Sequence, residues 1–368
     1  MHLCRSKTGV QFFISGTSNI VFQNIRTFAV TALTQADTSD SCRKMVDTQI
    51  GAMEFGRQTN ESESFEVMDY CLNKGLKWFD TALMYNGSKS EKIMGKYVVK
   101  EGRSKMYIAT KAYPGFSEKG FSFDGIVEQL EQSLSNLQTD HVDIFYLHHP
   151  DRNYPIEETL KACDHLHKQG KFKELGISNY AAWELAEIYY ICKLHDWVLP
   201  TVYQGMYNPL TRMVETELFP CMRRLGVRFF AYNMLAGGLL TGKHKMDDHP
   251  EDETKLGRFF GKEVWPSKYR QRFWHKEYFD GVTDIQNALT ACYGEGKVSL
   301  IEACNRWMYH HSMLSQKHGD GVILGGSSLT QLENNMKFIN QGPLDPNVVS
   351  VFDRSWLRVK GVCPRYNR

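Results

Sequence analysis

The feature that most constrains the fold is a regular alternation of short apolar runs with longer amphipathic segments, which starts near Asp47 and continues along the chain. This βαβα order predicts a parallel sheet with helices packed outside it. We expect eight strands, within residues 48–53, 76–82, 105–110, 142–148, 172–178, 200–205, 227–232 and 320–325. Eight strand–helix units without a long linker favour a closed (β/α)₈ TIM barrel over an open doubly wound sheet.

Local patterns indicate where several helices begin and end. Ser88 and Glu91 have the spacing of a capping box, which predicts that a helix starts there. In the next helix the apolar residues share one face: Ile126, Leu130, Leu134 and Leu137. Three glycines follow helical segments and precede strands, where a left-handed residue is favoured: Gly75, Gly170 and Gly226.

A long insertion, residues 243–276, separates the seventh expected strand from the eighth. It holds an acidic loop, residues 247–254, and then a basic, aromatic run, residues 257–274. Segments that follow the C-terminal end of a barrel strand lie over the active face. We therefore expect the insertion to act as a lid or as a wall of the substrate site.

Composition excludes several classes of protein. The 44 Lys and Arg nearly balance 42 Asp and Glu, for a net charge of +2, which argues against a nucleic-acid binder. The nine cysteines are scattered without a C-x-x-C pair, which predicts mostly buried, reduced thiols of an intracellular protein. We expect no membrane span, because no run approaches about 20 apolar residues.

The first 36 residues contain no Asp or Glu and many Ser and Thr. Residues 1–45 are therefore an extension of different composition before a barrel domain at 46–368. A mitochondrial transit peptide has this acidic-poor, hydroxyl-rich character. A disordered tail or a misplaced start codon, in a cytoplasmic protein, is the other interpretation, and the two stay open.

Several familiar motifs are incomplete. Residues 237–243 match G-x-x-x-x-G-K, but His244 replaces the hydroxyl residue that holds Mg²⁺ in a P-loop. The interpretation of these residues as a loop that contacts phosphate remains open. Residues 176–180 lack the second glycine of a nucleophile elbow. No G-x-G-x-x-G follows the first strand, and the histidine pairs lack metal-ligand spacing, so we expect neither a Rossmann site nor a metal.

Polar or small residues stand at the C-terminal ends of seven successive expected strands, where barrel enzymes carry their chemistry. They are Asp80, Lys111, His148, Ser178–Asn179, Gln204, Tyr232 and 325–328, and Tyr85 follows Asp80 by five residues. Each has a structural explanation when taken alone. Together they form a proton-delivery device in which Asp80 fixes Lys111, Tyr85 gives up a proton, and His148 orients the oxygen that receives it.

This set of side chains suits the reduction of a carbonyl group. No side chain supplies a hydride, so a nicotinamide is implied. Tyr normally titrates near 10, and we expect the Lys111 ammonium to lower the pKa of Tyr85. The Tyr232 ring offers a stacking surface for the nicotinamide, and Ser178, Asn179 and Gln204 offer hydrogen bonds to its carboxamide.

In this order, four segments resemble the aldo-keto reductase family: residues 78–91, 108–113, 145–151 and 176–180. Further segments resemble its aflatoxin-aldehyde reductase branch: residues 203–221, 229–243, 257–261, 270–274 and 321–335. The resemblance implies a catalytic tetrad of Asp80, Tyr85, Lys111 and His148, with Tyr85 as the proton donor. It implies substrate contacts at His148, Tyr269 and Arg272. It implies cofactor contacts at Asp80, Ser178, Asn179, Gln204, Tyr232, Asn233, Leu235, Gly237, Leu239, Gly242, Lys243, Arg258, Gly325, Ser327, Ser328, Gln331, Asn334 and Asn335.

The activity implied is NADPH-dependent reduction of reactive aldehydes, dialdehydes and semialdehydes by a homodimer. The Arg272 guanidinium suits substrates that carry a carboxylate. The sequence departs from the branch at Met234, usually proline, and Gly326, usually methionine. Positions 325 and 331 lack the basic residues with which the wider family reads the 2′-phosphate, so selectivity against NADH stays open. The alternative is a regulatory protein like the potassium-channel β-subunits, which share the barrel and the tetrad.

Overall fold

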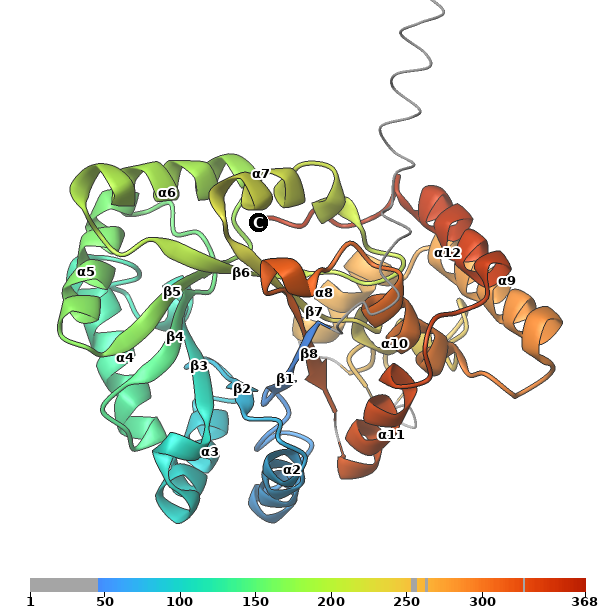
Figure 1. Ribbon diagram of the computed structural model, residues 1–368, viewed down its shortest axis with the longest axis horizontal. Helices are drawn as coiled ribbons and strands as arrows, with labels where there is room; N and C mark the ends of the chain where they lie inside the picture. Colours follow the sequence, from blue (N-terminus) through green and yellow to red (C-terminus); the bar gives the residue numbers. More distant parts are fainter. Residues whose placement is uncertain (1–45, 253–256, 262–263, 327) are drawn as a thin grey trace, which may run out of the picture. The chain divides into compact units, whose positions relative to one another are not determined.

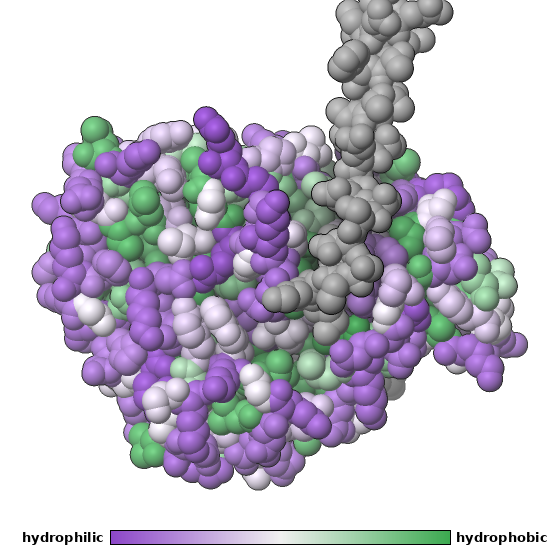
Figure 2. All heavy atoms as spheres, in the orientation of Figure 1, coloured by the Kyte–Doolittle hydropathy of each residue, from purple (hydrophilic) through white to green (hydrophobic). Residues whose placement is uncertain are grey.

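The computed structural model describes residues 46–368, apart from 253–256, 262–263 and 327. The expected extension at 1–45 and the expected cofactor residue Ser327 lie outside the described residues. Within them, hydrophilic side chains cover much of the face in Figure 2, with apolar side chains scattered between them.

Eight parallel strands form a closed barrel (Figure 1). Each strand pairs with its neighbours in chain order, and β8 closes onto β1. The strands are β1 (Asp47–Gly51), β2 (Trp78–Asp80), β3 (Tyr107–Ala112), β4 (Val142–Leu147), β5 (Phe172–Ser178), β6 (Pro200–Met206), β7 (Arg228–Tyr232) and β8 (Gly321–Gly325). The TIM barrel is thus confirmed, with every strand at its expected place in the sequence.

Helices surround the strands and cover the outside of the barrel (Figure 1). They are α2 (Glu61–Asn73), α3 (Lys89–Glu101), α4 (Phe123–Leu137), α5 (Ile156–Lys168), α6 (Ala182–His195), α7 (Leu218–Leu225), α8 (Val264–Phe273), α9 (Lys276–Tyr293), α10 (Leu300–His310), α11 (Leu329–Ile339) and α12 (Pro346–Val359). The four apolar residues expected on one face of α4 are all buried. The glycines at 75, 170 and 226 have positive φ, as expected.

The expected capping box at α3 is wrong. Ser88 has a left-handed backbone and caps no amide; its hydroxyl donates to the Leu83 carbonyl at 2.8 Å. Glu91 turns inward, is fully buried, and accepts hydrogen bonds from Thr110 at 2.6 Å and Asn136 at 2.9 Å. Interior hydrogen-bond donors that lie far away in the sequence therefore claim a carboxylate that the local pattern assigns to the helix end.

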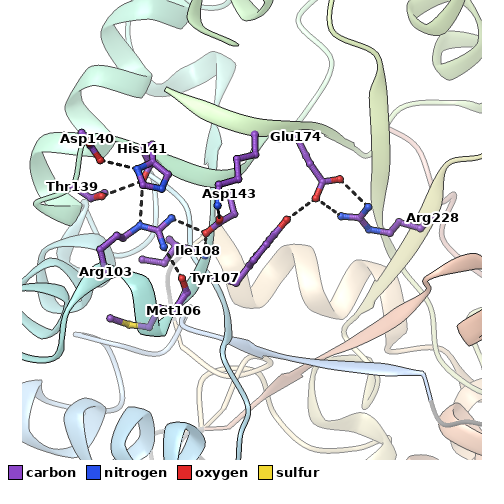
Figure 3. Close-up of polar contacts among 11 residues, drawn as sticks. Arg103, Met106, Tyr107, Ile108, Thr139, Asp140, His141, Asp143, Glu174 and Arg228 are labelled. Atoms are coloured by element: carbon purple, nitrogen blue, oxygen red, sulfur yellow. Dashed lines mark hydrogen bonds and ion pairs between the residues drawn. The ribbon is translucent and has the colours of Figure 1, made fainter. Parts of the chain in front are cut away.

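Paired charges and stacked rings lie at the N-terminal end of the barrel, and Figure 3 shows the charged groups. Glu174 pairs with Arg228 at 2.8 Å and accepts a hydrogen bond from the Tyr107 hydroxyl at 2.6 Å. Asp143 pairs with Arg103 at 2.6 Å, a contact also drawn in Figure 3. The Tyr107 ring stacks on Trp78, with centroids 3.8 Å apart. The charges at this end are neutralised by one another, so the polar groups at the opposite end are the candidates for chemistry.

The segment between β7 and β8 contains the short 3₁₀ stretch η4 (Ala236–Thr241), then α8, α9 and α10. The expected insertion packs back onto η4. The Tyr269 ring of α8 lies so close to Gly237 that a Cβ there would stand 2.6 Å from it. His244 lies among the rings of Phe259, Phe260 and Trp274.

The seven cysteines in the described part of the chain form no disulfide, and four of them are buried: Cys71, Cys163, Cys192 and Cys304. Within that same part, no helix combines the length and apolar character that a bilayer span requires. Nor do His, Cys, Asp and Glu gather there in groups of three that could ligate a metal ion.

Candidate active site

A buried ion pair stands at the C-terminal ends of β2 and β3. Lys111 Nζ donates to Asp80 Oδ1 and to the Thr81 carbonyl, both at 2.6 Å. Lys111 is fully buried and Asp80 is 3 % exposed. Burial lowers the pKa of Lys111, and the Asp80 carboxylate opposes that shift. The structure thus brings together Asp80 and Lys111, two residues of the expected tetrad.

Tyr85 lies over this pair, on the loop that follows β2. Its ring centroid is 5.0 Å from Lys111 Nζ and 5.8 Å from the His148 ring, edge to face. The expected direction of its pKa shift is wrong: burial, followed by the Asp80 carboxylate, raises the pKa of Tyr85 well above its usual value. Burial destabilises the charged tyrosinate. Tyr85 therefore keeps its proton at neutral pH, the form a proton donor needs.

His148 completes the group from the end of β4. Burial, then the Lys111 ammonium, lowers the pKa of His148 well below its usual value, so the imidazole is neutral. Its Nδ1 is buried and has no hydrogen-bond partner among the described residues. A neutral imidazole beside Tyr85 can donate one N–H to an oxygen atom without carrying charge.

The ends of β5, β6 and β7 form a polar platform next to the tetrad. Asn179, at a positive φ of 67°, donates to the His148 carbonyl at 2.9 Å and accepts a hydrogen bond from the Tyr232 hydroxyl at 3.1 Å. Gln204 donates from Nε2 to Asp80 Oδ2 at 2.8 Å, which leaves its amide oxygen free to accept. The Ser178 hydroxyl oxygen accepts a hydrogen bond from Asn179 Nδ2 at 2.9 Å. The expected carboxamide contacts therefore lie together, and Asp80 orients both Lys111 and Gln204.

After β7 the chain makes a glycine-rich loop with several positive φ angles, at Asn233, Gly237, Gly238 and Gly242. The Asn233 side chain accepts a hydrogen bond from the Gly237 amide at 2.6 Å. Leu239 is buried beneath the loop, Leu235 is half-buried and Lys243 is exposed. The amides of Gly238, Leu240 and Gly242 are bonded to carbonyls within the loop. Turns of this kind can present their remaining backbone N–H groups to a phosphate.

The end of β8 leads into the N-terminus of α11. Gly325 is exposed, and a Cβ placed there would meet no atom within 4 Å. The Ser328 side chain caps α11 by accepting from the Gln331 amide at 3.3 Å. Gln331 and Asn334 are exposed, whereas Asn335 is buried and accepts from Asn305 at 3.3 Å. A helix N-terminus beside open backbone is favourable for an anionic group.

The insertion contributes three side chains. Arg258 donates to the Tyr269 hydroxyl at 2.5 Å and to Glu54, after β1, at 2.7 Å. The Arg272 guanidinium lies 5.6 Å from the Tyr269 ring centroid. Burial, then the positive charge of Arg368, lowers the pKa of Arg272.

Arg368 is a site residue that sequence reasoning missed. Its backbone amide donates to the Asn179 carbonyl at 3.0 Å, and its own carbonyl oxygen accepts from Arg152 at 3.2 Å. Its charge also contributes to the lowered pKa values of His148 and His149. The strand-end rule could not find it, because Arg368 follows no strand and reaches the site only through the fold.

The sequence between residues 48 and 356 matches the family described as "Aldo/keto reductase family". The chain belongs to the aldo/keto reductase family. It is 50 % identical over 323 residues to human "Aldo-keto reductase family 7 member A3", covering 87 % of this chain and 97 % of the relative. It is also 50 % identical over 321 residues to human "Aflatoxin B1 aldehyde reductase member 4", covering 87 % and 96 %. A rat "Aflatoxin B1 aldehyde reductase member 2" is 50 % identical over 323 residues, 87 % of each chain. This aldo-keto reductase is therefore an oxidoreductase of the aflatoxin-aldehyde reductase branch.

Proposed function

We propose that the protein is an NADPH-dependent aldehyde reductase that converts reactive aldehydes, dialdehydes and semialdehydes to alcohols. The observation that carries the proposal is the meeting of Asp80, Lys111, Tyr85 and His148 at one end of the barrel. Such a group can deliver one proton to a carbonyl oxygen, and a reduced nicotinamide supplies the accompanying hydride.

The residues around the tetrad suit a dinucleotide. The half-buried Tyr232 ring offers a stacking face, and the Gln204 amide oxygen and Ser178 hydroxyl offer hydrogen bonds to a carboxamide. The glycine-rich loop after β7 and the N-terminus of α11 offer N–H groups to phosphates. The choice of NADPH over NADH rests on the similarity to the aflatoxin-aldehyde reductase branch.

Each tetrad residue has a distinct role in the proposal. Tyr85 donates the proton to the substrate oxygen, because its raised pKa keeps it protonated. Lys111 stabilises the tyrosinate that remains, since its ammonium lies 5.0 Å from the ring centroid. Asp80 holds that ammonium, and neutral His148 orients the aldehyde oxygen. Arg272 and Arg368, whose charges influence each other, attract a carboxylate on the substrate.

Replacing Tyr85 with Phe tests the proposal. Tyr85→Phe removes the hydroxyl and keeps the ring, so NADPH should still quench or shift the protein fluorescence while NADPH oxidation with 2-carboxybenzaldehyde falls by about 10²–10⁴-fold. Retained turnover would contradict the assignment of the proton donor. Loss of both binding and turnover would instead show a damaged site, which a thermal melt identifies.

A further inference from the structure

One row of paired residues starts at Lys111 of the tetrad and crosses three neighbouring strands. Lys111 of β3 is the direct partner of Tyr146 in β4, and Tyr146 is the direct partner of Gly176 in β5. Side chains at paired positions of adjacent strands point to the same face of a sheet. Lys111 and Tyr146 are both fully buried, so the row lies inside the barrel.

Gly176 makes the room in which the Tyr146 ring lies. A Cβ at position 176 would stand 2.3 Å from Cδ1 of that ring and 2.4 Å from Cε1, closer than any side chain tolerates. The ring therefore lies against the bare backbone of β5. This contact fixes its orientation next to Lys111.

The Lys111 ammonium lies between two aromatic rings. Its Nζ is 5.6 Å from the centroid of the Tyr146 ring and 5.0 Å from that of Tyr85. Two of its three N–H groups are engaged by Asp80 and Thr81. The titratable and charged groups that face it come from β2, the loop after β2, α3 and β4: Asp80, Tyr85, Glu91, Tyr146 and His148.

We propose that the Tyr146 ring is a positioning residue for the reaction, holding the Lys111 ammonium charged and in place through a cation–π interaction. Such interactions strengthen when the cation is removed from water, and burial otherwise destabilises the ammonium. The buried Tyr146 hydroxyl interacts with the Gln204 amide, which opposes the rise in the pKa of Tyr146 caused by burial. Lys111 Nζ donates to Asp80 and Thr81 rather than to this hydroxyl, so the ring is the part of Tyr146 that faces the ammonium. The role of this ring in turnover rests on the proposed reductase function.

A matched pair of variants separates the ring from the hydroxyl. Tyr146→Phe keeps the ring, whereas Tyr146→Met fills similar space with a flexible side chain that has no ring. In Tyr146→Met we expect the alkaline limb of the kcat–pH profile for aldehyde reduction to move down by about one pH unit. In Tyr146→Phe the limb should stay where it is in the unaltered protein.

A second measurement follows Lys111 without turnover. Nuclear magnetic resonance of [¹⁵N]lysine-labelled, cofactor-free protein can titrate the Lys111 ammonium, with the resonance assigned by its loss in Lys111→Met. Its pKa should fall in Tyr146→Met and not in Tyr146→Phe. If the protein proves not to be a reductase, this titration still tests the contact between Tyr146 and Lys111.

Three results would overturn the proposal. One is an equal fall in the Lys111 pKa in both variants, which would assign the effect to the hydroxyl. Another is an unchanged Lys111 pKa in Tyr146→Met with activity lowered equally at every pH, which is what a purely structural role produces. If Tyr146→Met does not fold, Tyr146→Leu takes its place, and an unchanged Lys111 pKa in that variant counts against the proposal in the same way.

Discussion

Replacement of Arg272 by Ala tests whether this end of the barrel is built for substrates with a carboxylate. The Arg272 guanidinium is half-buried, and burial together with the nearby charge of Arg368 lowers its pKa. The repulsion between these two positive charges falls when an anion binds between them. We therefore expect Arg272→Ala to lower kcat/KM selectively for aldehydes that carry a carboxylate.

The magnitude follows from the kind of contact that is lost. A hydrogen bond between charged groups contributes about 1.5–3 kcal/mol. Because Arg368 remains, we expect a loss of about 2 kcal/mol, which is roughly a 30-fold fall in kcat/KM. A neutral aldehyde of similar size makes no such contact, so its kcat/KM should stay within about twofold.

The assay measures NADPH oxidation with 2-carboxybenzaldehyde and with benzaldehyde at several salt concentrations. Lys268→Ala is the matched control, because it removes one positive charge from the same helix, α8, while its side chain lies over Trp265, 5.2 Å from the ring centroid. Equal losses for both aldehydes in Arg272→Ala would refute the carboxylate role. So would an equal, selective loss in Lys268→Ala, which would show that only the overall field matters.

Three further changes test other parts of the structure. Asp80→Asn leaves the fully buried Lys111 without its anionic partner and should lower the free energy of unfolding by about 3–5 kcal/mol; urea denaturation measures this, and an unchanged midpoint contradicts it. Burial raises the pKa of Glu174, but hydrogen bonds from Arg228 and its other partners outweigh burial, and the folded pKa is lowered. The ionised Glu174 therefore stabilises the fold above its unfolded pKa of about 4.3. This contribution is lost as the pH falls through the lower folded pKa. Glu174→Gln should therefore be less stable than the unaltered protein at pH 7, and the gap should narrow in acid; a gap independent of pH rules this out. Gly95→Ala places a Cβ 2.1 Å from the Asn136 carbonyl oxygen, so α3 must move from α4 at a cost of at least about 1–3 kcal/mol, and a melting temperature equal to that of the unaltered protein argues against so close an approach.

The barrel and most of the candidate active site could be predicted from the sequence alone. Short apolar runs and the 3.6-residue period of amphipathic helices are local properties, so the strands and helices could be placed from them. Parallel strands in a barrel end at one face. For this reason Asp80, Lys111 and His148 could be expected together before any distance was known.

Features that depend on partners distant in the chain could not be predicted in this way and became visible only in the folded structure. Glu91 has a capping-box spacing, yet buried donors in β3 and α4 bind it. Tyr85 was expected to have a lowered pKa beside Lys111, but burial, which no local pattern reports, raises it. Arg368 reaches the site from a segment with no strand end. The register of β3, β4 and β5 sets Tyr146 beside Lys111, because hydrogen bonding between strands, rather than the sequence of any one strand, fixes which residues are neighbours.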